Sequence, residues 1–276
     1  MIKRCGLDGN EVTGLSEKAK RDRKTPRELI EFEVLANQWL SPHLVRLTLG
    51  GPGFNNFINR PETDKYLKLV FTVEDPEARQ ITRTYTVRKV DSAHRSLDVD
   101  FVVHGSDGIA GPWAAQVQPG ASISARGPGG GYAPSPHASW HLFAGDLSAV
   151  PAIAAALEAL DSTAEGVALI EIPDATAQMA LSAPSGVDVR WVLDPEHRQD
   201  TLAEEIAKQD LSRPGIQAFV HGERESVKAI RAVLFKEKSL TRGQVSISGY
   251  WARGRTEDRF QAEKREPIGQ IFPENQ

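Results

Sequence analysis

The chain has 276 residues, with 40% hydrophobic and 25% charged residues, which suits two folded domains and excludes wholesale disorder. Its 33 Lys and Arg residues face 37 Asp and Glu residues, and the net charge of -4 argues against general binding to nucleic acids or anionic membranes. A single cysteine, Cys5, excludes an internal disulfide and a cysteine-rich metal site built from this chain alone. The start lacks the apolar stretch of a signal peptide, and Asp146 and Glu158 interrupt the apolar tract 141–160. These features predict a soluble, cytoplasmic protein.

The first half of the chain is predicted to be all-β. Residues 1–26 are polar and without period, which predicts a flexible tail. Short alternating segments follow, rich in Val, Thr, Tyr and Phe and separated by turn residues; they cover 31–51 (two strands around a Ser41-Pro42 turn), 66–73, 81–90, 96–105 and 121–132. Six or so short strands at this spacing predict an antiparallel barrel or sandwich over residues 27–135.

The pattern changes after Ala133-Pro134-Ser135-Pro136 to strands that alternate with helices. Strands are predicted at 140–145, 166–172, 187–193, 216–223 and 244–251, and helices at 151–160, 201–209 and 225–238. This alternation is typical of a parallel sheet with crossover helices, so residues 136–276 form a predicted α/β domain. The glycine-rich segment 127–131 lacks the spacing of a dinucleotide fingerprint and is interpreted as the turn between the domains.

The strongest local motif is Arg83-Thr84-Tyr85-Thr86 on a predicted strand. A guanidinium can pair with a phosphate, while an aromatic ring and hydroxyl groups suit a flavin ring system. An ordinary barrel strand also favours Thr and Tyr, so the tetrapeptide alone leaves both interpretations open.

Several other segments are weak indicators when taken singly and become informative when they are considered together. Asp100–His104 ends a strand, and the two glycines of 108–114 precede a helix-like segment, where free N–H groups suit a phosphate or simply start a helix. Asp146 and Ser148 follow the first α/β strand, and Gly222-Glu223 ends the fourth, so both groups should line one edge of the sheet.

Read in this order, the chain resembles the siderophore-interacting protein family of flavin-dependent ferric-siderophore reductases, related to ferredoxin–NADP reductases. The resemblance is carried by the segments 83–88, 100–105, 108–114, 144–160, 220–223 and 248–260, and it spans about residues 27–260. It implies a flavin-binding antiparallel β-barrel followed by a parallel-sheet nucleotide-binding α/β domain. It also implies that the C-terminal segment returns to the flavin, and that FAD, with NADPH or NADH, serves as cofactor.

The resemblance assigns roles by position. The residues it implies for FAD are Arg83, Thr84, Tyr85, Thr86, Asp100, Val102, His104, Ala110, Gly111, Trp113, Asp146, Ser148, Tyr250 and Trp251. Gly222 and Glu223 match the element facing the nicotinamide, and Lys68, Arg253 and Arg255 are expected to attract the substrate. Ile109 and Leu147 depart from the family pattern, at a usual Pro and a usual acidic residue. No catalytic side chain and no metal ligand are implied, because electrons pass through the flavin.

The expected activity is NAD(P)H-dependent reduction of a ferric siderophore, of catecholate or hydroxamate type, by a monomer. A general NAD(P)H:flavin or quinone reductase and a siderophore carrier without turnover remain alternatives. The choice between NADH and NADPH is expected to depend on the region of Glu171 and Asp174, where a carboxylate would disfavour a 2′-phosphate, and stays open.

Overall fold

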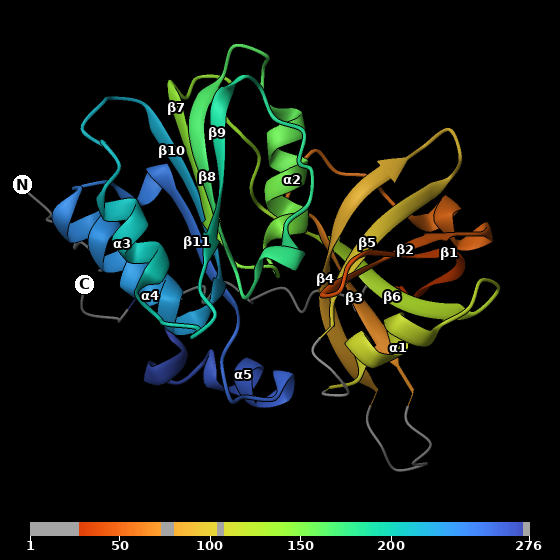
Figure 1. The fold of residues 1–276 in the computed structure, drawn as a ribbon. Helices are drawn as coiled ribbons and strands as arrows, with labels where there is room; N and C mark the ends of the chain where they lie inside the picture. Colours follow the sequence, from red (N-terminus) through yellow and green to blue (C-terminus); the bar gives the residue numbers. More distant parts are fainter. Residues whose placement is uncertain (1–27, 73–79, 104–107, 273–276) are drawn as a thin grey trace, which may run out of the picture.

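The computed structural model describes residues 28–72, 80–103 and 108–272, and within these ranges it contains a closed barrel and a five-stranded sheet (Figure 1). The tail 1–26, Cys5 and His104 lie outside the described residues. The barrel strands are β1 (Ile30–Ser41), β2 (Leu44–Gly50), β3 (Tyr66–Phe71), β4 (Ile81–Asp91), β5 (Ser96–Val102) and β6 (Ser122–Gly129). The sheet strands are β7 (Trp140–Gly145), β8 (Glu165–Ile172), β9 (Gly186–Leu193), β10 (Ile216–Glu223) and β11 (Val245–Trp251).

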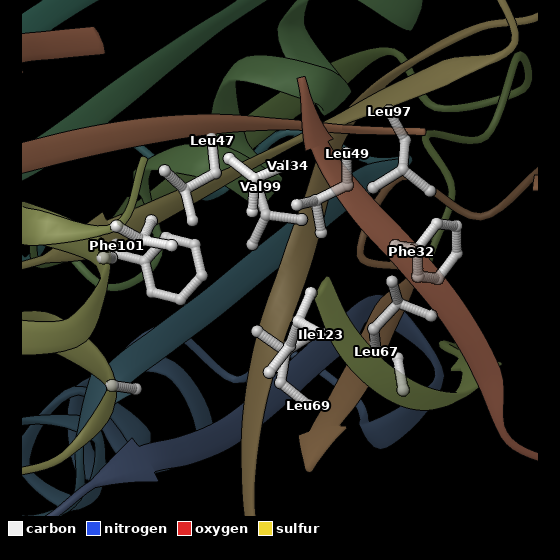
Figure 2. Close-up of a cluster of buried hydrophobic side chains, with 14 of the residues drawn as sticks. Phe32, Val34, Leu47, Leu49, Leu67, Leu69, Leu97, Val99, Phe101 and Ile123 are labelled. Carbon is white, nitrogen blue, oxygen red and sulfur yellow. The ribbon is translucent and has the colours of Figure 1, made fainter. Parts of the chain in front are cut away.

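The barrel closes in the order β1-β2-β5-β4-β3-β6, and its paired strands are antiparallel. Alternate residues point inward, so Leu47 and Leu49 on β2 are fully buried while their neighbours Arg46 and Thr48 are not. Figure 2 shows these leucines converging with Phe32, Phe101 and other apolar side chains inside the barrel. The structure therefore confirms the predicted antiparallel β-barrel.

The sheet is entirely parallel, with strand order β11-β10-β7-β8-β9. Helix α2 (Val150–Ala159) covers the face toward the barrel and packs on β4, whereas α3 (Thr201–Ala207) and α4 (Arg224–Ala232) cover the other face (Figure 1). The order reverses between β7 and β10, because the helix after β7 lies on one face and the helix after β10 lies on the other. Ligands of open α/β sheets bind at such a point.

Shorter helices complete the fold. Helix α1 (Ala110–Gln116) follows β5, and α5 (Glu257–Glu263) follows β11 beside the barrel (Figure 1). Single 3-10 turns occupy Pro52–Asn56, Ala175–Ala177, Arg242–Gln244 and Pro267–Gly269. In the described part of the chain, no helix is long and apolar enough to cross a lipid bilayer.

Three local expectations need correction. The predicted helix 225–238 becomes π-helical over Val233–Glu237, where the Lys238 N–H donates to the Val233 carbonyl. The segment 127–131 is not only a turn, because β6 continues to Gly129 and pairs with Tyr66 on β3. A Cβ at Gly129 would lie 2.3 Å from Cζ of Tyr66, so the Tyr66 ring packs directly on this glycine. Helix α5 was not predicted at all.

Candidate functional site

The candidate site lies at the carboxyl ends of β7, β8, β10 and β11, where the sheet meets barrel strands β3 and β4. The Tyr250 and Thr86 side chains form a hydrogen bond, which joins β11 to β4 across this junction. Tyr132, just after the barrel, packs on Phe219 of β10 with ring centroids 4.7 Å apart. The two domains therefore enclose the edge of the sheet that is expected to bind a nucleotide.

Asp146 links three elements at this edge. Its carboxylate accepts hydrogen bonds from the Ser148 N–H (2.9 Å), the Glu223 N–H (2.7 Å) and the Trp251 indole N–H (2.8 Å). Burial raises the pKa of Asp146, while the hydrogen bonds from Ser148 and Trp251 oppose that shift. Four residues expected at the cofactor, Asp146, Ser148, Glu223 and Trp251, are thus brought together, with Asp146 holding the loops after β7 and β10 in place.

Glu223 ends β10 and begins α4. Its carboxylate accepts from the Glu225 N–H (2.6 Å) and the Ser226 N–H (3.0 Å), which caps the helix, and from the Arg253 N–H (3.0 Å). Gly222 before it has φ +149, and a Cβ there would lie 2.8 Å from an Asp146 carboxylate oxygen. The two residues expected at the nicotinamide therefore shape a tight crevice between β7 and β10.

The strand Arg83–Thr86 presents different side chains to its surroundings. The Arg83 guanidinium donates to the Asp258 carboxylate of α5 at 3.2 and 3.3 Å. Thr84 is exposed beside Lys68 of β3, whereas the Tyr85 ring lies 4.2 Å from the Phe101 ring between centroids. Burial raises the pKa of Tyr85 above its ordinary value. Thr84 is therefore the exposed polar group of this motif, whereas the Arg83 side chain is only 14% exposed and is bound to α5.

The residues expected around β5 and α1 mainly build the barrel end. Asp100 is buried and binds the Arg46 guanidinium at 2.6 and 2.8 Å. The Trp113 ring packs against the Phe71 ring at 5.4 Å. Ala110 and Gly111 are also buried, and a Cβ at Gly111 would lie 3.0 Å from the Val102 carbonyl oxygen, so the start of α1 closely approaches β5.

Glu171, which was considered above for the choice between NADH and NADPH, and His221, which was assigned no role, are buried polar groups at this edge of the sheet. Glu171, near the end of β8, is 7% exposed, and its Oε2 has no hydrogen-bond partner among the described residues. Burial and then the neighbouring Asp146 and Asp194 raise the pKa of Glu171 to about 8. The His221 ring stacks on Phe219 at 3.9 Å and meets Tyr250 at 4.9 Å, and burial lowers its pKa to about 3. Both side chains are therefore predicted to be neutral at pH 7. Their positions in the sequence could not reveal this, because it follows from their burial.

Asp174, the other carboxylate considered for donor choice, faces the barrel. It accepts from the Thr176 N–H at 2.8 Å and contacts the His43 Nε2 of the β1–β2 turn at 2.8 Å. The Thr176 hydrogen bonds, and then His43, lower the pKa of Asp174. Its contacts therefore help to join the domains.

The three cationic residues expected at the substrate, Lys68, Arg253 and Arg255, lie on different elements and have different partners. Lys68 is exposed on β3, opposite Thr84 and Arg126 in the two strand ladders. The Arg253 guanidinium donates to the His197 carbonyl after β9, and Arg255 donates to the Glu263 carboxylate of α5 at 2.8 Å. Lys68 is thus the cation of this set on the barrel side.

Known proteins share this arrangement. Residues 72–132 match the family model of a siderophore-interacting FAD-binding domain, and residues 138–254 match that of a siderophore-interacting protein. An uncharacterised protein of Mycobacterium tuberculosis is 43% identical over 87% of this chain and 96% of its own. The ferric vibriobactin reductase ViuB of Vibrio cholerae is 34% identical over 91% and 98%. An NADPH-dependent ferric-chelate reductase of Escherichia coli is 27% identical over 80% and 92%.

Solved structures of known proteins have a similar fold. The siderophore-interacting protein SipS of Aeromonas hydrophila superposes with a TM-score of 0.77 at 28% identity, covering 87% of this chain and 98% of its own. A ferredoxin-NADP+ reductase of Plasmodium falciparum superposes with a TM-score of 0.64 at 11% identity, over 80% of this chain and 96% of its own, and shares the fold.

Proposed function

This chain belongs to the siderophore-interacting protein family, and from that membership and the site at the domain junction we propose that it is an FAD-containing ferric-siderophore reductase using NADH or NADPH. The observation that carries the proposal is the junction itself. The strand with Arg83 and Thr84 is joined to β11 by the Thr86–Tyr250 hydrogen bond. A flavin held by the barrel would there meet a nucleotide held by the sheet.

The chemistry of the residues present fits an FAD. Arg83 offers a guanidinium and Thr84 an exposed hydroxyl on β4, groups suited to a phosphate and to polar ring atoms. Gly111 lets α1 approach Val102 closely, at a place where a larger residue would fill the space. Trp113, Tyr85 and Tyr250 supply aromatic surface, and Ala110 and Thr86 complete the proposed cradle. The place of His104 in it stays a prediction.

Bound FAD would supply chemistry that no side chain of the chain can supply, since it accepts a hydride and passes electrons on singly. The protein contributes binding, orientation and electrostatics. Asp146 fixes the ends of β7, β10 and β11 relative to one another through its hydrogen bonds with Ser148, Glu223 and Trp251, and Gly222 lies beside them, where the nucleotide is proposed to bind. Asp100 orients Arg46 and supports the barrel end beside Val102, so its proposed role toward FAD is indirect.

The proposed substrate is a ferric siderophore of catecholate or hydroxamate type, reduced in the cytoplasm by a monomer. Lys68 is the proposed attractive group on the barrel side, while Arg253 and Arg255 act from the C-terminal segment. Because electrons need only proximity to reach the iron, the proposal requires no protein ligand to the metal. Fe(II) is then held more weakly by hard oxygen donors and leaves the chelator.

Steady-state turnover tests the proposal. The FAD-loaded protein, given NADH or NADPH and Fe(III)–tris(catecholate) under nitrogen with an Fe(II)-specific trap, should form two ferrous ions for each nucleotide oxidised, because a hydride carries two electrons. Nucleotide oxidation with quinone but not with any ferric chelate would favour a quinone reductase. Siderophore binding without nucleotide oxidation would favour a carrier.

A further inference from the structure

Arg253 lies just after β11, on a backbone segment that the ends of two neighbouring strands hold in place. Its N–H donates to the Glu223 carboxylate at the end of β10 (3.0 Å), and the indole of Trp251, two residues earlier, donates to Asp146 after β7 (2.8 Å). Ala252 between them is buried. The side chain of Arg253 therefore begins from a fixed point at the carboxyl ends of β7 and β10.

The Arg253 side chain extends from this point toward the strands on the other side of β7. Its guanidinium donates to the carbonyl of His197, in the loop after β9. That loop is held at the end of β8, because the Asp194 N–H donates to the Ile172 carbonyl (2.9 Å) and the His197 N–H donates to the Asp194 carbonyl (3.2 Å). Since β7 lies between β10 and β8 in the sheet, the side chain crosses the carboxyl end of β7.

The positive charge of Arg253 is not neutralised by a carboxylate. Arg224 and Arg255 both bind the Glu263 carboxylate, whereas Arg253 has no ion pair within 4.0 Å in the described part of the chain. The residue is exposed, and the hydrogen bond to His197 uses one of the five N–H donors of its guanidinium. A fixed and unpaired guanidinium thus lies at the end of the strand whose following loop binds the phosphates of a nucleotide in α/β sheets.

We propose that Arg253 binds the diphosphate of the nicotinamide nucleotide and so belongs to the electron-donor site. A guanidinium can bind phosphate oxygens through two parallel N–H···O bonds, and NADH and NADPH carry the same diphosphate. The inference rests on the proposed function, and it reassigns Arg253 from the ferric substrate to the donor. Loss of this guanidinium should therefore weaken nucleotide binding and leave the ferric substrate unaffected.

The test compares Arg253→Gln with the matched control Arg213→Gln, which changes an exposed arginine that precedes β10 at the opposite edge of the sheet. In the FAD-loaded protein, Arg253→Gln should raise the KM for the nucleotide that the protein oxidises by about tenfold, because a charge-assisted contact is lost. The KM for Fe(III)–tris(catecholate) should stay constant. Arg253→Lys should lose less, since it keeps the charge, and Arg213→Gln should behave as the unmodified protein.

A binding measurement without turnover supplies the second readout. Calorimetric titration with ADP-ribose, which carries the diphosphate but no nicotinamide, should show a loss of affinity of about tenfold in Arg253→Gln and none in Arg213→Gln. FAD retention equal to that of the unmodified protein would show that Arg253→Gln is folded, because the substituted side chain is exposed.

Other outcomes overturn the inference. An unchanged affinity for ADP-ribose in Arg253→Gln would exclude the diphosphate contact, and a rise in KM confined to the ferric complex would return Arg253 to the substrate site. The proposed function fails in a different way. If the unmodified protein oxidised no nucleotide with a ferric chelate, the reductase would be refuted, whereas an affinity for ADP-ribose that depends on Arg253 would still support the nucleotide site.

Discussion

Two carboxylates at the same edge of the sheet have opposite surroundings. Asp146 receives hydrogen bonds from Ser148, Glu223 and Trp251, whereas Oε2 of Glu171 is buried and receives none among the described residues. Burial raises the pKa of Glu171 from its ordinary 4.5 to about 8. A raised acid pKa means that the stability Glu171 contributes is complete below about pH 4.5 and is lost as the pH rises toward 8.

Glu171→Gln should therefore remove a pH-dependent loss of stability. We expect the variant to exceed the unmodified protein in free energy of unfolding at pH 8.5, by on the order of 2–4 kcal/mol, with the difference declining toward pH 5. Urea denaturation at several pH values measures it. Glu165→Gln, at the exposed start of β8, is the control and should leave the pH profile unchanged. A constant difference at all pH values would contradict the assignment.

The location of Asp146 and Ser148 at the edge of the sheet could be predicted from the sequence, because residues that directly follow a parallel strand lie at that edge. The sequence could not reveal that the Asp146 acceptor atoms are occupied by Glu223 and Trp251, which lie far along the chain. Nor could it distinguish Glu171 from a solvated carboxylate, since its burial depends on the packing of α3 and α4 over the sheet.

The elements that form the nucleotide crevice are held by close backbone contacts. The loops after β7 and β10 meet through the Asp146–Glu223 hydrogen bond, and Gly222 lies directly beside it. Its φ of +149 is a conformation that only glycine adopts readily. The crevice therefore depends on the absence of a side chain at this residue.

Gly222→Ala should strain this crevice, because its Cβ would lie 2.8 Å from the Asp146 carboxylate in an unfavourable backbone conformation. We expect a loss of about 1–3 kcal/mol in the free energy of unfolding and a clear rise in the KM for NADH or NADPH. Gly243→Ala, where a Cβ meets no atom within 4 Å, is the control. Equal stability and equal KM in both variants would show that the crevice tolerates a side chain.

Helix α5 shows where element prediction fails. Its segment has one buried aromatic residue, Phe260, and no clear apolar period. Its buried Glu263 instead binds Arg224 of α4 and nearby Arg255 and Arg259, whose guanidinium groups, led by Arg224, lower its pKa to about 2. The contact with Arg224, 39 residues away, leaves no local pattern in the sequence, whereas the alternation of strands and helices from residue 140 does.

At the scale of the whole molecule, the two domains are joined by several kinds of contact around the proposed flavin position. The Arg88 guanidinium of β4 binds the Glu158 carboxylate of α2, His43 contacts Asp174, and Thr86 bonds to Tyr250. The succession of an antiparallel barrel and a parallel sheet could be predicted from local patterns. The closure order of the barrel and these contacts could not, because they depend on which strands meet in space.

The central claim is that this junction carries electrons from a nicotinamide nucleotide through FAD to a ferric chelate. Anaerobic absorbance spectra of the FAD-loaded protein test it most directly, with NADH or NADPH added first and Fe(III)–tris(catecholate) with an Fe(II) trap added second. We predict that the flavin bands bleach with a nucleotide and recover as the ferrous signal rises. Bands that bleach but never recover with the ferric complex would contradict reduction of the chelate. Failure of the protein to retain FAD would contradict the flavin site itself.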